Sequence, residues 1–163
     1  MDEKALIERT RRTAERLFGP PKPGEGAFAL WRSFDPEVAK HMSLFFTGRL
    51  YAREVISQKQ RELCAVAALT VTNMQHELHI HANAALNVGA TPKEVAEVIF
   101  QMQTYGGVPC TVEGLKTLKA VLEERGEWHP APLPSKPVGE KADGKGAGKS
   151  GGKSGKKGGK GRA

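Results

Sequence analysis

Residues 61–115 read RELCAVAALTVTNMQHELHIHANAALNVGATPKEVAEVIFQMQTYGGVPCTVEGL, and the spacing of their apolar side chains decides the fold class. Apolar residues recur every three or four positions, and no segment alternates apolar with polar residues, so the pattern predicts helices. Thr91-Pro92-Lys93-Glu94 combines an N-cap hydroxyl, a proline at the first helical position and a capping-box glutamate. This stretch is therefore expected to form a series of helices.

The same spacing continues on the N-terminal side of this stretch. Residues 2–18 predict an amphipathic helix, and the proline- and glycine-rich residues 19–27 predict a connector. Asp35-Pro36 predicts the N-cap and first residue of a further helix, which we expect to stop near Gly48.

Further local signals divide the chain from Ser57 onwards into helices. Ser57 predicts an N-cap, and the helix it opens contains the run 63–69, whose apolar character on nearly all sides predicts full burial. Asn73 predicts a break, after which a helix from 75 to 88 is expected, and a last helix should run from about 108 to 125. We therefore predict a single all-α domain of about six helices.

Charge is unevenly distributed along the chain. Residues 130–163 hold nine basic and two acidic side chains, whereas basic and acidic side chains balance over residues 1–129. The proline-, lysine- and glycine-rich end has too little apolar surface to fold, so we predict disorder there. The predicted organisation is an N-terminal helical region (1–54), a helical core (55–126) and a disordered tail (127–163).

Several cellular contexts are disfavoured by the sequence. The longest apolar runs are far shorter than the roughly 20 residues that a membrane-spanning helix needs. The N-terminus has no apolar segment of the kind found in secretory signals. Cys64 and Cys110 lie far apart and form no CxxC motif, which favours a cytoplasmic protein with reduced thiols.

The histidine-rich run 76–81 first suggests a metal site. A zinc-protease motif needs a second histidine four residues after His76, but Ile80 occupies that position. His76 and His79 alone would be an incomplete ligand set. We therefore expect no metal site and predict that these histidines lie on a solvated helix face.

His81 and Glu62 are the polar residues placed best for chemistry. On a helical repeat, His81 aligns with Leu78 and Ala85 on the side that we expect to be buried. His81 could be an ordinary core histidine, and Glu62 could be an exposed carboxylate in the first turn of its helix. Alternatively, Glu62 meets His81 across two neighbouring helices, and a paired carboxylate and imidazole in an apolar pocket form an acid–base unit.

Residues 61–115 resemble the carboxymuconolactone decarboxylase family, the relatives of alkylhydroperoxidase D. The matching elements are RELxxxAALT, HxxAALNxG with His81, TPKEVxEV and YGGVP. The resemblance implies an all-α fold that assembles into homo-oligomers, as dimers, trimers or hexamers.

The resemblance also implies a reaction. In the peroxidase branch of the family, a glutamate is followed by a CxxC motif and a histidine. Glu62 and His81 stand at the matching ends, but Met74 and Glu77 occupy the cysteine positions and cannot form a disulfide. The resemblance therefore implies the decarboxylase branch, which acts on a small carboxylated lactone such as 4-carboxymuconolactone through a dienolate, without a metal or organic cofactor.

Within this interpretation, His81 is the proton donor or oxyanion partner, and Glu62 orients it or acts as its proton reservoir. Four further residues are candidate substrate-binding groups: Glu77, Tyr105, Arg61 and Arg49. The two arginines could hold substrate carboxylates.

Two alternative functions belong to other classes. One is a thiol-dependent peroxidase or antioxidant protein, which the missing CxxC motif disfavours. The other is a non-enzymatic helical oligomer whose lysine-rich tail binds nucleic acid or another polyanion in a salt-sensitive manner. The tail could equally be a solubilising appendage.

Overall fold

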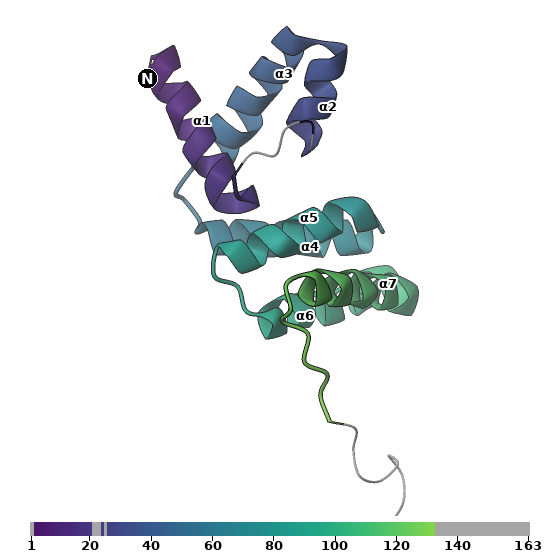
Figure 1. Ribbon diagram of the computed structural model, residues 1–163. Coiled ribbons are helices and arrows are strands. Elements are labelled where there is room, and N and C mark those ends of the chain that lie inside the picture. The colour runs from purple at the N-terminus through teal and green to yellow at the C-terminus, as the bar shows by residue number, and fades with distance from the viewer. Residues whose placement is uncertain (1, 21–23, 25, 133–163) are drawn as a thin grey trace, which may run out of the picture. The chain divides into compact units, whose positions relative to one another are not determined.

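A computed structural model describes residues 2–20, 24 and 26–132 (Figure 1), and residues 1–129 form one compact unit. Every regular element of the described residues is a helix, which confirms the predicted all-α class. None of these helices is both long and apolar enough to cross a bilayer. Most of the tail for which we predicted disorder, residues 133–163, lies outside the described residues.

The described part of the chain contains seven α-helices and one π-helix. They are α1 (Glu3–Phe18), α2 (Gly26–Phe34), α3 (Pro36–Ser43), η1 (Leu44–Tyr51), α4 (Gln58–Val71), α5 (Gln75–Asn87), α6 (Pro92–Gln101) and α7 (Gln103–Glu124). Helix α2 is an addition to the helices that the sequence predicted, whereas α3 and most of η1 lie within the helix predicted from Asp35-Pro36 to about Gly48.

The predicted helix starts are built by side-chain caps. Asp2 accepts a hydrogen bond from the Ala5 amide at the start of α1, and Asp35 caps α3. Ser57 and Thr91 each form a complete capping box, at the starts of α4 and α6. These caps satisfy amide groups that the helix itself leaves without partners.

The predicted end of a helix near Gly48 is wrong. The chain continues from α3 into the π-helix η1, which runs through Gly48 to Tyr51. Gly48 instead lies against α1, where an added Cβ would meet Thr10 and Leu6. The glycine thus allows a close approach of two helices and does not act as a stop signal.

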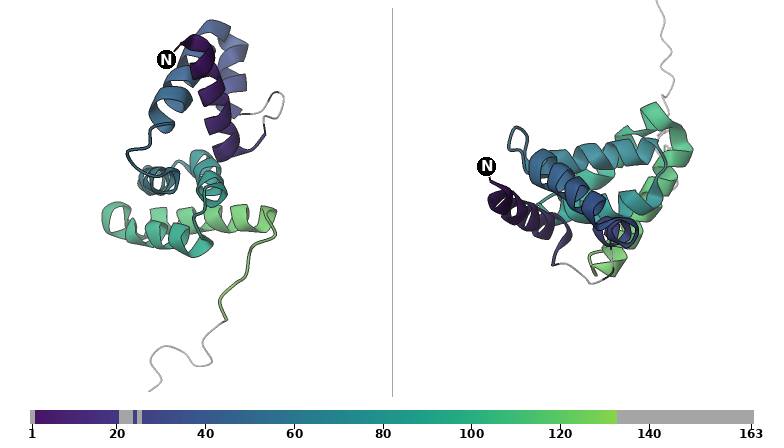
Figure 2. Two further views of the ribbon diagram at one scale, coloured as in Figure 1. Left: turned by 90° about the vertical axis from the view of Figure 1, so that its left-hand side faces the viewer. Right: turned by 90° about the horizontal axis from the view of Figure 1, so that it is seen from above.

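Helices α4–α7 enclose the main core. Figure 1 shows α4 beside α5 and α6 beside α7, and α4, α5 and α6 all contact α7. In the N-terminal part, α2 packs on α3 and α1 packs on η1, as the views of Figure 2 also show. The core side chains come mainly from α4–α7: Val66, Leu78, Ala82, Ala85, Leu86, Ala90, Val95, Ile99, Leu118, Val121 and Leu122.

The predicted full burial of residues 63–69 in α4 is also wrong. Val66 is completely buried, but Cys64 and Ala68 are exposed. The buried face of α4 is a single stripe at a spacing of four residues, formed by Glu62, Val66 and Thr70. A helix whose apolar residues surround it on all sides can therefore bury one face only, when its neighbours pack on that face.

Helix α7 bends near its start. Gly107 has non-helical angles (φ 81°, ψ 174°), and Pro109 follows it. The regular part of α7 thus begins where the sequence predicted the last helix to start. Asn73, which has a positive φ of 57°, likewise lies at the predicted break between α4 and α5.

One side chain links the ends of three helices. The Asn87 amide nitrogen donates to the Leu17 carbonyl at the end of α1, over 2.8 Å. The Asn87 amide oxygen accepts a hydrogen bond of 2.9 Å from Arg125, which follows α7. Asn87 itself is the last residue of α5, so α1, α5 and α7 meet at this point.

Candidate active site

Glu62 and His81 meet where α4 and α5 pack together. Glu62 lies on the buried stripe of α4, and His81 lies one turn after the buried Leu78 of α5. Nδ1 of His81 is 2.7 Å from Oε2 of Glu62. The pairing that the sequence left as one of two readings of Glu62 is thus present as a hydrogen bond.

The two members of this pair differ in their access to solvent. The Glu62 side chain is fully inaccessible, whereas 17% of the His81 side chain is exposed. Within the described residues, Nε2 of His81 makes no hydrogen bond, and the buried Oε1 of Glu62 has no partner either. The imidazole is therefore held from one side by a buried carboxylate and is accessible from the other.

Two aromatic rings flank His81. The Phe18 ring, at the end of α1, meets the imidazole edge-on at a centroid distance of 6.2 Å and an angle of 82°. The Tyr51 ring, at the end of η1, lies 6.3 Å from it at an angle of 31°. Both rings restrict water around the imidazole, which strengthens electrostatic interactions there.

Tyr51 is also a polar group of this site. Burial raises the pKa of its phenol, and the negative charge of Glu62 raises that pKa further, while Arg61 opposes both effects. The Arg61 guanidinium lies over the Tyr51 ring, 5.8 Å from its centroid. Like an ordinary tyrosine, Tyr51 is protonated at neutral pH and can donate a hydrogen bond.

The other candidate substrate-binding residues lie at varied positions. Arg61 is held by its contact with the Tyr51 ring and by a 3.2 Å hydrogen bond to the Arg53 carbonyl. Arg49 is exposed on η1, Glu77 is half-buried in the first turn of α5, and Tyr105 is 71% exposed on α7. Their role in substrate binding stays a prediction.

The remaining histidines of α5 face away from this pair. His79 is partly exposed and lies 3.0 Å from Glu124 at the end of α7, while His76 is exposed. In the part of the chain that the structure describes, no group of three or more His, Cys, Asp or Glu side chains could hold a metal ion.

No pattern in the sequence predicted that Phe18 and Tyr51 lie beside His81. Phe18 reads as the last apolar residue of an amphipathic helix, and Tyr51 as a residue beyond the expected helix end at Gly48. Both reach His81 from elements more than 25 positions away in the chain. Only the packing of α1 and η1 against the pair reveals their place.

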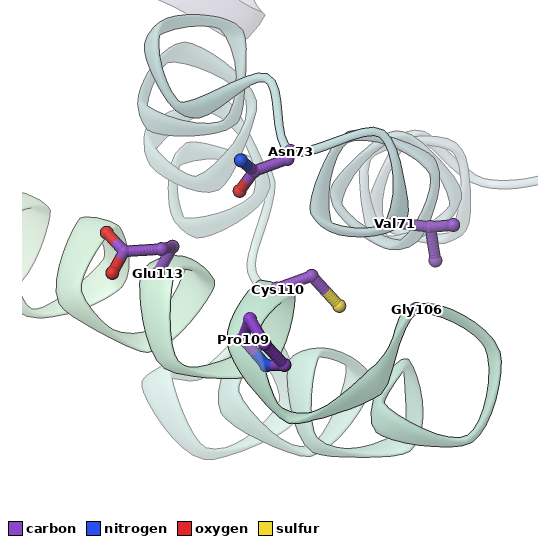
Figure 3. Close-up of a pocket in the computed structure, with 6 residues that line it drawn as sticks. All are labelled: Val71, Asn73, Gly106, Pro109, Cys110 and Glu113. Carbon is purple, nitrogen blue, oxygen red and sulfur yellow. The ribbon is translucent and has the colours of Figure 1, made fainter.

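A separate small cavity of about 250 Å³ lies near Cys110 (Figure 3). It is lined by Val71, Asn73, Gly106, Pro109, Cys110 and Glu113. The Cys110 thiol donates to the Gly107 carbonyl over 3.1 Å, and Cys64 is exposed on α4. Neither cysteine belongs to the surroundings of Glu62 and His81.

Comparison with known proteins now identifies the family. Residues 36–120, just over half of the chain, match the carboxymuconolactone decarboxylase family. The chain belongs to that family. The match to the carboxymuconolactone decarboxylase family contains Glu62, His81 and Tyr51, whereas α1 with Phe18 precedes it.

Two proteins are similar to this chain over about half of its length. One is the "Uncharacterized 15.0 kDa protein in nqo9-nqo10 intergenic region" of Paracoccus denitrificans, which is 33% identical over 56% of this chain and 70% of its own length. The other is nitrosuccinic acid decarboxylase npaB of Metarhizium robertsii, which is 27% identical over 50% of this chain. The aligned part spans 59% of that decarboxylase.

Proposed function

We propose that this protein is a cofactor-free decarboxylase that acts on a small carboxylated acid and uses Glu62 and His81 for proton transfer. The observation that carries the proposal is the 2.7 Å contact between the fully buried Glu62 carboxylate and the partly exposed His81 imidazole. A general acid needs this arrangement, with one nitrogen fixed and the other free for the substrate.

The chemistry assigned to the pair is the return of a proton to carbon. When the C–C bond to the departing carboxylate breaks, its electron pair stays on carbon and spreads into the neighbouring electron-withdrawing group, and CO₂ leaves. The protonated His81 then gives its Nε2 proton to a carbon of the resulting conjugated anion, while Glu62 accepts a hydrogen bond from Nδ1 and stabilises the imidazolium. A proton from water restores His81, so each turnover consumes one proton.

Tyr51 is the residue that we assign to the developing negative charge. A hydrogen bond from a protonated phenol stabilises an enolate or a similar oxyanion. The phenol is protonated at neutral pH even without this upward shift in its pKa, and the ring already lies beside His81. Its role complements that of His81, which supplies the proton.

The names of the family and of the Metarhizium robertsii relative support a proposal for the substrate class. Carboxymuconolactone and nitrosuccinic acid both lose a carboxylate next to a group that can accept the electron pair, an unsaturated lactone in the first and a nitro group in the second. Both also keep a second carboxylate after CO₂ has left. We therefore propose a small di- or tricarboxylate of this kind as the substrate.

The test is CO₂ release from 4-carboxymuconolactone and from 2-nitrosuccinate by the wild type, His81→Asn and Glu62→Gln. We expect His81→Asn to lower kcat by about 10²-fold or more, the usual contribution of a positioned general acid. In D₂O the wild-type product should carry one deuterium, at the carbon that lost CO₂ when 2-nitrosuccinate is the substrate and at one end of the conjugated dienolate when 4-carboxymuconolactone is the substrate. Wild-type protein that releases CO₂ from neither acid would refute these two substrates.

A matched control exists on the same helix. His79 and Glu124 form a second imidazole–carboxylate pair at 3.0 Å, but on the surface. His79→Asn removes the same chemical group and should leave kcat unchanged. If His79→Asn and His81→Asn reduced kcat equally, the reaction would not depend on the buried pair.

A disulfide-based peroxidase is not proposed. Met74 and Glu77 occupy the two cysteine positions of that branch, and Cys64 and Cys110 are free thiols apart from Glu62 and His81. The homo-oligomeric assembly and the cytoplasmic location expected from the sequence stay predictions.

A further inference from the structure

A cleft of about 650 Å³ lies along α1, and four arginines line it. Arg9, Arg12 and Arg16 project from α1, and Arg53 follows η1. Glu54 is the acidic side chain among the lining residues. The volume of this cleft is within the range of small-molecule sites and is too small for a folded partner.

The cleft adjoins the Glu62–His81 pair. Leu17 lines the cleft, and the next residue, Phe18, packs on the His81 ring. Ala52 lines it too, and the preceding Tyr51 packs on the same ring. A molecule bound among the arginines would therefore touch residues next to both aromatic neighbours of the imidazole.

Helix α4 contributes both a lining residue of the cleft and the buried carboxylate. Gln58 lines the cleft, donates to the Tyr51 carbonyl and precedes Glu62 by one helical turn. Neither Glu62 nor His81 lines the cleft itself. Binding in the cleft and proton transfer at the pair are thus adjacent but distinct tasks.

The charges of the cleft are poorly neutralised by the protein. Arg9 donates to the Ala52 carbonyl, which fixes its guanidinium but leaves its charge uncompensated. Arg12 is 3.7 Å from the exposed Glu8, and in the described structure neither Arg16 nor Arg53 forms an ion pair. Several guanidinium groups around one concave surface repel each other and attract an anion.

We propose that this arginine cleft binds the carboxylates of a small di- or tricarboxylate and presents the ligand to His81. The inference rests on the proposed function for the identity of the ligand, although binding can be measured without turnover. Guanidinium groups bind carboxylates through paired hydrogen bonds, which gives both affinity and orientation. The carboxylate that remains after CO₂ loss is the group that the arginines hold.

The test measures binding of tricarballylate, a tricarboxylate with no group to stabilise a carbanion, to the full chain by calorimetry. We expect Arg16→Gln and Arg53→Gln each to raise the Kd about tenfold, as the loss of one charged hydrogen-bond partner does. Higher salt should weaken wild-type binding more than it weakens binding by either variant.

The matched control is Arg11→Gln. Arg11 lies on the same helix but pairs with Glu8 and Glu15 and does not line the cleft. Its removal changes the net charge by the same amount, so a Kd within about twofold of the wild type is expected. Equal effects of Arg11→Gln and Arg16→Gln would overturn the proposal, because attraction by net charge alone would then explain binding.

Inorganic phosphate is the second probe. Phosphate that binds more tightly than tricarballylate, with the same loss in Arg16→Gln, would assign the cleft to a phosphate-bearing ligand and overturn the carboxylate class. In turnover, Arg16→Gln should raise KM while His81→Asn lowers kcat.

The two proposals fail separately. His81→Asn should bind tricarballylate like the wild type, since His81 does not line the cleft. If substitution of Glu62 or His81 did not change CO₂ release, the proposed function would fail, but tricarballylate would still bind in the cleft. If Arg16→Gln and Arg53→Gln both bound tricarballylate as the wild type does, the cleft would not be the binding site, and the assignment of Glu62 and His81 would be unaffected.

Discussion

Gly48 shows how one missing side chain sets the distance between two helices. An added Cβ would meet Thr10 and Leu6 of α1. The Thr10 hydroxyl is already hydrogen-bonded to the Leu6 carbonyl and is buried, so it has little freedom to move. The position of η1, and with it that of Tyr51, therefore depends on a glycine at this point.

Gly48→Ala should lower the free energy of unfolding by about 1 kcal/mol. Alanine favours a helix over glycine by about 1 kcal/mol, but overpacking of a buried contact costs about 1–3 kcal/mol, and the second effect should be larger here. Urea unfolding measures the difference. An increase in stability would mean that α1 and η1 can separate without cost.

Combining Gly48→Ala with Thr10→Ala separates the helix propensity of alanine from the cost of overpacking. Thr10→Ala removes the atoms that the new methyl group would meet, so Gly48→Ala should cost less in that background. A double-mutant cycle then gives the coupling between the two positions. Additive effects would indicate that the two side chains do not meet.

At the scale of a helix, the start of α6 combines a cap with an ion pair to α4. Glu94 accepts hydrogen bonds from Thr91 and lies 2.7 Å from Lys59 of α4. The Lys59 hydrogen bond first, and the Thr91 backbone and hydroxyl next, lower the pKa of Glu94 from 4.5 to about 2. The capping box thus joins two helices of the core as well as starting one.

The lowered pKa predicts a pH-dependent contribution to stability. Glu94 is ionised in the folded state at pH values at which it is protonated when unfolded, so its contribution is complete above about pH 4.5 and is lost as the pH falls towards 2. Glu94→Gln should therefore be less stable than the wild type at pH 7, by a difference that shrinks below pH 4.5.

Urea unfolding of both proteins between pH 7 and pH 3 checks this prediction. Glu97→Gln is the matched control, because Glu97 is exposed on α6 and forms no ion pair within the described structure. A stability difference for Glu94→Gln that stays constant over the whole pH range would contradict the prediction.

The helix starts could be predicted from sequence because caps are local. Ser57 and Thr91 satisfy amides within three residues of themselves, so the residues that build the signal are neighbours in the chain. The burial of α4 and the role of Gly48 depend on which helices lie opposite, and the sequence holds no local record of that.

The candidate site shows the same division. His81 follows from the periodicity of α5, and its meeting with Glu62 could be posed as a hypothesis from two adjacent helices. Phe18, Tyr51 and the arginines of α1 come from separate elements. Arg9, Arg12 and Arg16 do carry a signal, a basic stripe at helical spacing, but a stripe of that kind is also typical of a solvated face.

At the scale of the whole molecule, basic side chains are concentrated in two places. Residues 1–129 carry balanced charge but place several arginines around one cleft, whereas residues 130–163 carry the excess of lysine. The two should differ in what they bind: the cleft a small anion, and the basic end any polyanion. Net charge therefore does not predict the specificity of either part.

Removal of residues 130–163 tests whether polyanion binding depends on the basic end of the chain. The truncated chain should keep its core, since all the core residues of the described structure lie before residue 123, and its Tm should shift by no more than about 2 °C. If the basic end binds polyanions, salt-sensitive DNA binding should be lost, because the lysines that would neutralise phosphates are removed. Calorimetry and a salt titration of DNA binding measure both, and equal DNA binding by both proteins would exclude a role for this end.

Asn87 has a consequence for how the molecule opens. Its amide nitrogen holds the last turn of α1 and its amide oxygen holds Arg125 after α7, so rotation of this one side chain releases both contacts. Backbone amides of α1 and of the end of α7 should then exchange with solvent in one cooperative event. Because α1 carries both Phe18 and the arginines of the cleft, that event would expose the imidazole and dismantle the anion site at the same moment.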